Sequence, residues 1–233
     1  MYFAGYTLFT LGVGDVIPTR GAQRLLTPVA TLHGLFTITL AITYLLPVMS
    51  AAVERRRQAA TIWAMGGDAP GIVCQGWRSD RFTVLAQQLL ALTDDLLTTV
   101  ERHPTYPVLH YFVTDDARSS FSARVAALDD AVSLMTYAVA AEVRPSSSVL
   151  VPLRRIIDEL LRGAPRARGE LTEPPLPSLR PLVDAGIPLA PATEVRRRFS
   201  DCAGRRRELA GLVTDAGYCW ADVQAAPDAE GDG

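Results

Sequence analysis

A long stretch without charged residues constrains this chain more than any other feature. Residues 25–53 contain no Asp, Glu, Lys or Arg, and His33 is their one side chain that titrates near neutral pH. About 20 apolar residues are enough to cross the hydrocarbon core of a membrane as a helix. A buried helix of a soluble protein is the alternative, but a helix that is apolar on every face is rarely this long outside membranes. We therefore expect a transmembrane helix over Leu25–Val53.

The charges beside this stretch predict its orientation. Arg55, Arg56 and Arg57 follow almost directly, and clusters of positive charge stay on the cytoplasmic side of a membrane. Arg24 at the other end is a weaker signal in the opposite direction. We expect the chain to lie in the cell membrane, with residues 58–233 in the cytoplasm.

A short segment before the apolar stretch carries an unusual pattern. Tyr2–Phe9 is apolar but too short to cross a membrane, and it is followed by Thr-Leu-Gly-Val-Gly-Asp at residues 10–15. A dehydrated monovalent cation needs a cage of oxygen atoms. Successive backbone carbonyls can supply it when alternate residues adopt unusual dihedral angles, which glycine tolerates best. Four copies around an axis then form stacked oxygen rings, so the pattern indicates a cation pore.

These residues resemble the potassium channel pore family. The family pattern is Thr-(Val/Ile/Leu)-Gly-(Tyr/Phe)-Gly-Asp, with a proline three residues after the acid. Gly34 also lies at the spacing of the inner-helix glycine found in the simple two-helix channels, and the resemblance covers residues 2–57. The residues that fit the filter pattern are Thr10, Leu11, Gly12, Gly14, Asp15 and Pro18.

The resemblance implies a homotetramer that conducts potassium passively across the membrane. It assigns the ion ligands to backbone carbonyls, adds the Thr10 hydroxyl at the inner mouth, and makes Gly34 and Pro47 the candidates for gating. Potassium is the permeant ion and lipid the surrounding partner, and no cofactor is expected. In the filter, carbonyls come from Thr10, Leu11, Gly12 and Val13, while Gly14 supplies the turn and Asp15 braces the filter from behind.

Two departures from the family pattern leave alternatives open. Val13 replaces the usual aromatic residue, which leaves a weakly selective cation pore as a rival to a potassium pore. The chain also starts a few residues before the filter, without the outer helix of the family. We expect a fragment or a start placed too late, and a membrane-anchored helical regulatory protein with a non-functional pore fragment is the alternative of a different class.

The sequence as a whole predicts an all-α protein. We expect a short pore helix over the apolar segment Tyr2–Phe9, then the filter loop and one transmembrane helix, all within residues 1–57, followed by a cytoplasmic helical domain. Glycines and a proline in 58–81 indicate a linker, and a helical domain follows over 82–223, with a proline- and arginine-rich loop at 164–181. Leucines recur there at helical spacing. Residues 224–233 form an acidic tail that we expect to be disordered. The helices expected in the domain span 82–103, 119–143, about 147–162 and 192–216.

Two carboxylate pairs in the helical domain raise the question of a catalytic site. They are Asp115-Asp116 and Asp129-Asp130. Adjacent residues on a helix point in different directions, so we expect both pairs to lie on solvated faces. Together with the lack of a convincing nucleophile–base pair, this predicts that the chain is not an enzyme.

Arginine and cysteine usage adds two further expectations. The triplets Arg196–Arg198 and Arg205–Arg207 are expected on a solvated helix face, with no nucleic-acid partner, because the chain has a net charge of -2 and no nucleic-acid motif accompanies them. The cysteines Cys74, Cys202 and Cys219 are far apart in the sequence, which favours reduced thiols over a zinc site or a disulfide framework.

Overall fold

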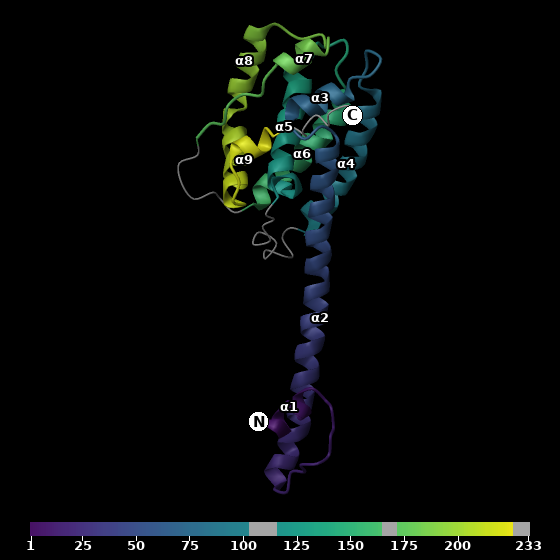
Figure 1. The fold of residues 1–233 in the computed structure, drawn as a ribbon, viewed down its shortest axis with the longest axis vertical. Helices are drawn as coiled ribbons and strands as arrows, with labels where there is room; N and C mark the ends of the chain where they lie inside the picture. Colours follow the sequence, from purple (N-terminus) through teal and green to yellow (C-terminus); the bar gives the residue numbers. More distant parts are fainter. Residues whose placement is uncertain (103–115, 165–171, 226–233) are drawn as a thin grey trace, which may run out of the picture. The chain divides into compact units, whose positions relative to one another are not determined.

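The computed structural model describes residues 1–102, 116–164 and 172–225, and over these ranges its regular elements are helices, with two isolated β-bridges. The predicted all-α class is confirmed. The chain divides into unit 1, Met1–Ser50, and unit 2, Ala51–Gly233. In Figure 1 the elements are α1 (Tyr2–Leu8), α2 (Gly21–Ala64), α3 (Ala69–Gly76), α4 (Thr83–Arg102), η2 (Ala117–Ser119), α5 (Phe121–Tyr137), α6 (Ser147–Gly163), α7 (Arg180–Asp184), α8 (Ala192–Asp201), α9 (Ala203–Asp215) and α10 (Trp220–Val223).

Several predictions fall outside the described residues. They concern the last residue of the helix expected over 82–103, Asp115 of the first carboxylate pair, residues 165–171 of the proline- and arginine-rich loop, and residues 226–233 of the acidic tail.

Unit 1 consists of α1, the connecting segment and the first part of α2. Among the described residues, α2 is the one helix long and apolar enough to cross a membrane. It extends beyond the predicted 25–53 at both ends because the polar flanks are helical too. Pro47, one of the two gating candidates, lies inside this helix, which continues beyond it to Ala64. Large apolar side chains along α2 are exposed, among them Leu25, Val29, Leu32, Phe36, Leu40, Leu45 and Leu46.

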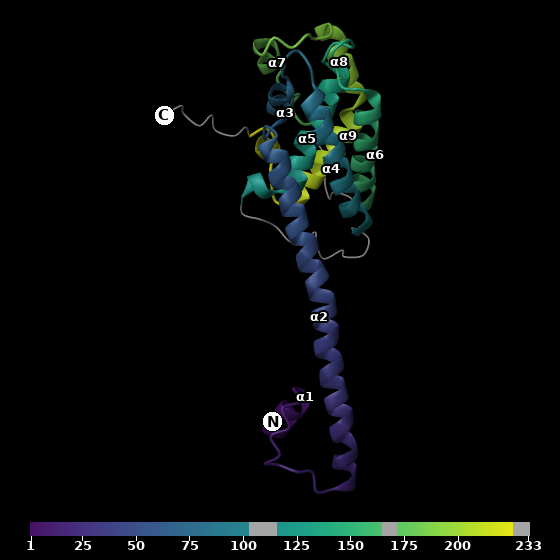
Figure 2. The ribbon, with the colours of Figure 1, turned by 90° about the vertical axis from the view of Figure 1, so that its right-hand side faces the viewer.

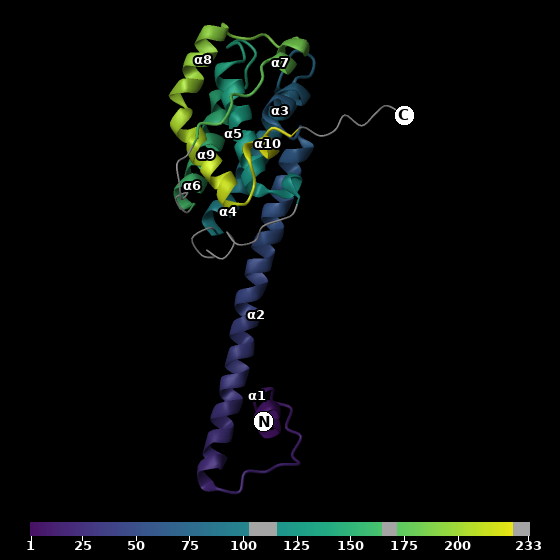
Figure 3. The same ribbon diagram turned by 60° about the vertical axis from the view of Figure 1, so that its left-hand side comes forward.

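Unit 2 is a helical bundle around α5. This helix contacts α3, α6, α8, α9 and α10, and it lies among the other helices in both turned views (Figure 2, Figure 3). The last part of α2, from Ala51, also belongs to unit 2. The leucine periodicity predicted for α4 is confirmed, because the side chains of Leu85, Leu89, Leu92 and Leu96 are buried in the core.

The segment 58–81 is not the linker that its glycines predicted. It contains the end of α2 and the whole of α3, and Ile62 and Ile72 are buried. Gln58 is also buried, where its amide donates to the Asp95 carbonyl at 2.8 Å and accepts from the Thr99 hydroxyl at 2.9 Å. The glycines allow close approach: a Cβ on Gly66 would lie 2.3 Å from a backbone carbon of Gly71.

Tertiary contacts also change two helix boundaries. The helix expected over 119–143 ends at Tyr137, because Ala140 donates to the Pro188 carbonyl at 2.9 Å and leaves the helical path. The helix expected over 192–216 is two helices, α8 and α9, and Cys202 caps the junction.

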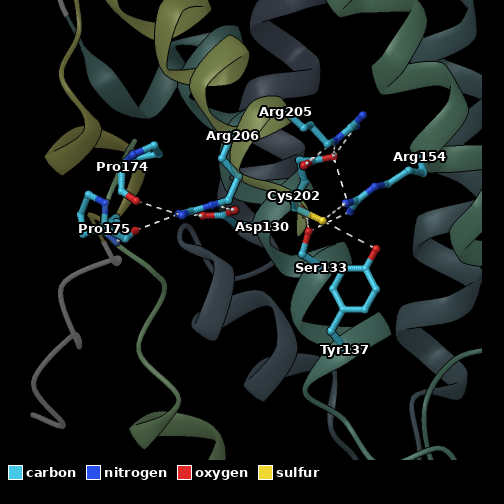
Figure 4. Close-up of polar contacts among 11 residues, drawn as sticks. Asp130, Ser133, Tyr137, Arg154, Pro174, Pro175, Cys202, Arg205 and Arg206 are labelled. Atoms are coloured by element: carbon cyan, nitrogen blue, oxygen red, sulfur yellow. Dashed lines mark hydrogen bonds and ion pairs between the residues drawn. The ribbon is translucent and has the colours of Figure 1, made fainter. Parts of the chain in front are cut away.

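The pair Asp129-Asp130 does not lie on a solvated face, which corrects the sequence interpretation. Asp129 is 0% exposed and Asp130 is 2% exposed. Arg206 is also fully buried, and its guanidinium contacts both Asp130 oxygens at 2.9 and 3.0 Å (Figure 4). The remaining Arg206 donors reach the carbonyls of Pro174 and Pro175 at 2.9 and 2.8 Å. Burial raises the pKa of the Asp130 carboxyl, and the contact with Arg206 opposes that rise.

The neighbouring Asp129 belongs to a second ion-pair group. Arg205 donates to both of its carboxylate oxygens and also pairs with Asp158. Arg154 lies 3.8 Å from Asp129 and donates to Ser133 at 2.8 Å. In the second arginine triplet Arg206 is therefore buried, Arg205 is half-buried and Arg207 is exposed, whereas Arg196–Arg198 is exposed, as expected.

Candidate functional site

The predicted filter segment connects α1 to α2 within unit 1. Its residues, 10–15, are exposed in the single chain. A Cβ added to Gly12 would meet no atom within 4 Å, and one added to Gly14 would meet only the Gly12 carbonyl oxygen at 3.8 Å. Packing within one chain therefore does not require these two glycines.

Their backbone conformation does require them. Every second residue of the segment has a positive φ, with 59° at Thr10, 58° at Gly12 and 81° at Gly14. Residues other than glycine disfavour positive φ, because their Cβ atom meets the backbone. This alternation is the dihedral pattern that the sequence analysis associated with carbonyls turned toward one side.

Thr10 is the exception, because a β-branched residue with positive φ is uncommon. It occupies the position after the C-cap of α1, where helices usually place glycine. The amide of Thr10 donates to the Thr7 carbonyl at 3.2 Å, and the amide of Leu11 donates to the Tyr6 carbonyl at 2.9 Å. These two bonds define a Schellman motif. Thr10 is therefore a backbone outlier at a position where glycine would avoid the conformational cost.

Three side chains attach the loop after the filter to the flanking helices. The Tyr2 hydroxyl interacts with the Asp15 carboxylate, and the Tyr6 hydroxyl donates to the Val16 carbonyl at 2.5 Å. From α2, Arg24 donates to the Pro18 carbonyl at 3.1 Å. The arrangement places Asp15 against α1. Sequence reasoning missed both tyrosines, although their spacing of four residues on a helix was a usable signal.

Gly34 of α2 lies against Leu8 at the end of α1 in unit 1. A Cβ at this position would lie 1.9 Å from the carbonyl oxygen of Leu8 and 2.9 Å from its Cα. This contact favours the packing interpretation of Gly34, since small residues permit close approach of helices in membranes. The gating roles of Gly34 and Pro47 stay predictions.

The comparisons with known proteins agree with this site at the level of class. Residues 1–51 match a family model described as an ion channel. This segment includes α1, the predicted filter segment and most of the apolar part of α2. The match supports an ion channel segment in a membrane protein. The function of such a segment is ion transport rather than catalysis.

A relative extends the likeness beyond that segment. The uncharacterized membrane protein YdjJ of Bacillus subtilis (strain 168) is 30% identical over 222 residues, which are 94% of this chain and 65% of the relative. The chain thus spans just under two thirds of the relative's length, and the aligned region must include most of unit 2. No solved structure matches the chain.

Proposed function

We propose that the chain is a subunit of a homotetrameric potassium channel. The observation that carries the proposal is the positive φ at Thr10, Gly12 and Gly14, in a segment whose residues fit the potassium filter pattern. Irregular backbone is tolerated at membrane depth only where protein buries it or water lines it. An exposed loop beside an apolar helix meets that condition when four copies enclose it.

In this proposal the carbonyls of Thr10, Leu11, Gly12 and Val13 replace the hydration shell of potassium. The Thr10 hydroxyl adds a ligand at the inner mouth. Gly14 lets the backbone turn, and Asp15, held by Tyr2, braces the filter.

The remaining roles follow from the orientation predicted by Arg55–Arg57. Unit 2 lies in the cytoplasm, and α2 passes from the pore into it as one continuous helix. Movements of unit 2 can then reach the pore through α2, with Gly34 and Pro47 as the positions where the helix responds.

Potassium flux into liposomes that contain the full chain tests the proposal. We expect potassium uptake down its gradient. In Gly12→Ala the uptake rate should fall about tenfold or more, because alanine is disfavoured at a φ of 58°. Gly5→Ala is the matched control. Gly5 lies inside α1 with nothing within 4 Å of an added Cβ, so uptake should persist.

Each other result has a defined meaning. Absence of flux in the unmodified chain would favour the membrane-anchored regulatory protein. Unchanged flux in Gly12→Ala would show that residues 10–15 do not form the ion pathway. Equal sodium and potassium flux would identify a weakly selective cation pore, the alternative that Val13 raises.

A further inference from the structure

Tyr6 stands out among the residues of α1 because it is buried although its helix is short. Its side chain is 8% exposed, and in α1 only Thr7 is buried as well. Its ring meets the rings of Tyr2 and Phe3 edge-on, with 5.3 Å between centroids in both pairs. This packing directs the phenol of Tyr6 at the Val16 carbonyl, which it contacts at 2.5 Å.

The filter itself provides no such support. Val13 is 54% exposed, and its side chain has neither a ring to pack sideways nor a hydroxyl to donate. Val16 follows Gly14 by two residues, so a hydrogen bond to its carbonyl restrains the outer end of the segment with alternating φ. The packed aromatic rings of α1 thus position Tyr6 to restrain the loop, a support that the side chain of Val13 cannot provide.

We propose that Tyr6 is a positioning residue that sets the discrimination between potassium and sodium. The inference rests on the proposed channel function. Carbonyl rings favour the larger ion only while their spacing is held, and functional groups need a supporting shell to keep them within about 0.5 Å of the productive position. Without the Tyr6 hydroxyl, the outer rings can contract around sodium.

The test compares Tyr6→Phe with the unmodified chain in liposomes. Phenylalanine keeps the ring contacts with Tyr2 and Phe3 and removes only the hydroxyl. We expect the ratio of potassium to sodium flux to fall about fivefold, the size that corresponds to one lost hydrogen bond, with most of the change arising from faster sodium flux. A variant that merely unfolds α1 would lose both fluxes together.

Tyr44→Phe is the control, because it removes the same hydroxyl from α2 rather than from α1, and it should leave the flux ratio unchanged. A second measurement, hydrogen exchange in lipid nanodiscs, reports the loop directly. Tyr6→Phe should speed exchange at residues 13–17 about fivefold and leave exchange at residues 2–9 unchanged.

The outcomes separate this inference from the proposed function. Absence of flux in the unmodified chain overturns the channel proposal and the selectivity role with it, while the exchange data still record whether Tyr6 restrains the loop. Normal flux in the unmodified chain with an unchanged ion ratio in Tyr6→Phe overturns the inference alone. Unchanged exchange at residues 13–17 also overturns it.

Discussion

Unit 1 and unit 2 distribute polarity in opposite ways. In unit 1 many large apolar side chains are exposed, as with Leu25 at 76% and Phe36 at 63% exposure. In unit 2 the largest fully buried side chains include two arginines, Arg124 and Arg206, each at 0% exposure. Each unit therefore departs from the common pattern of apolar residues inside and charged residues outside.

The difference shows what each unit needs from its surroundings. Lipid solvates leucine well, so α2 gains little by burying it, and unit 1 depends on close backbone contacts and special dihedral angles. Unit 2 buries its apolar residues but adds buried charges that need polar partners. Arg206 pairs with Asp130, and Arg124 donates to the backbone carbonyls of Gly67 and Asp222. Glycine substitutions should therefore damage unit 1, and loss of a charge partner should damage unit 2.

The largest effect is expected from Asp130→Ala in unit 2. The variant leaves Arg206 buried without its carboxylate, which costs about 3–5 kcal/mol of unfolding free energy. Denaturant unfolding of the full chain in detergent micelles, followed by tryptophan fluorescence, measures this loss. The signal reports unit 2, since all three tryptophans, Trp63, Trp77 and Trp220, lie there.

An exposed ion pair provides the control for that measurement. The side chains of Glu159 and Arg162 pair at 2.8 Å but are 50% and 67% exposed. Glu159→Ala should change stability by about 0–1 kcal/mol. An Asp130→Ala variant as stable as Glu159→Ala would show that the buried pair is not a determinant of the unit 2 fold.

An intermediate effect is expected from Gly34→Ala in unit 1. The added Cβ would meet the Leu8 carbonyl, so α1 must move away from α2, at a cost of about 1–3 kcal/mol. Hydrogen exchange at residues 2–9 in nanodiscs should become faster, and potassium flux should fall. Gly5→Ala should affect neither. If exchange stays slow in Gly34→Ala, the close contact of α1 with α2 is not a determinant of unit 1.

The smallest effect on stability is expected from Thr10→Gly, and it has the opposite sign. Glycine relieves the positive φ at the end of α1, which is worth about 1 kcal/mol, so exchange at residues 9–14 should slow. Ion selectivity should nevertheless fall because the hydroxyl is gone. Thr10→Ala is the matched comparison, since it loses the hydroxyl but keeps the strain. Full selectivity in Thr10→Gly would show that the Thr10 hydroxyl does not contribute to ion selection.

Much of unit 1 could be predicted because its signals are local. The pore helix was expected over Tyr2–Phe9 and spans Tyr2–Leu8, and the membrane helix was expected inside the limits of α2. Hydropathy could not give the end of α2 at Ala64, because the helix continues through the arginine cluster into a packed core. The spacing of Tyr2 and Tyr6 placed both on one face of α1, but it could not show their contacts with the loop, because the loop residues lie outside the helical repeat.

In unit 2 the helices with strong hydrophobic periodicity, such as α4, could be predicted from the sequence. The burial of charged residues could not. We expected solvated positions for Asp129, Asp130 and Arg206, because charged residues are rarely buried. Their burial depends on α5 and α9, which lie far apart in the sequence and meet only in the folded bundle.

The sequence by itself determined the membrane helix, the filter pattern and the helical class, because these follow from local composition and spacing. Only the tertiary structure decided which charges are buried, why Gly34 must be small, and which tyrosine holds the loop after the filter. The physical reason is the same in all three cases. Burial, steric contact and hydrogen bonding depend on a partner that the residue meets through folding, and no window along the chain contains that partner.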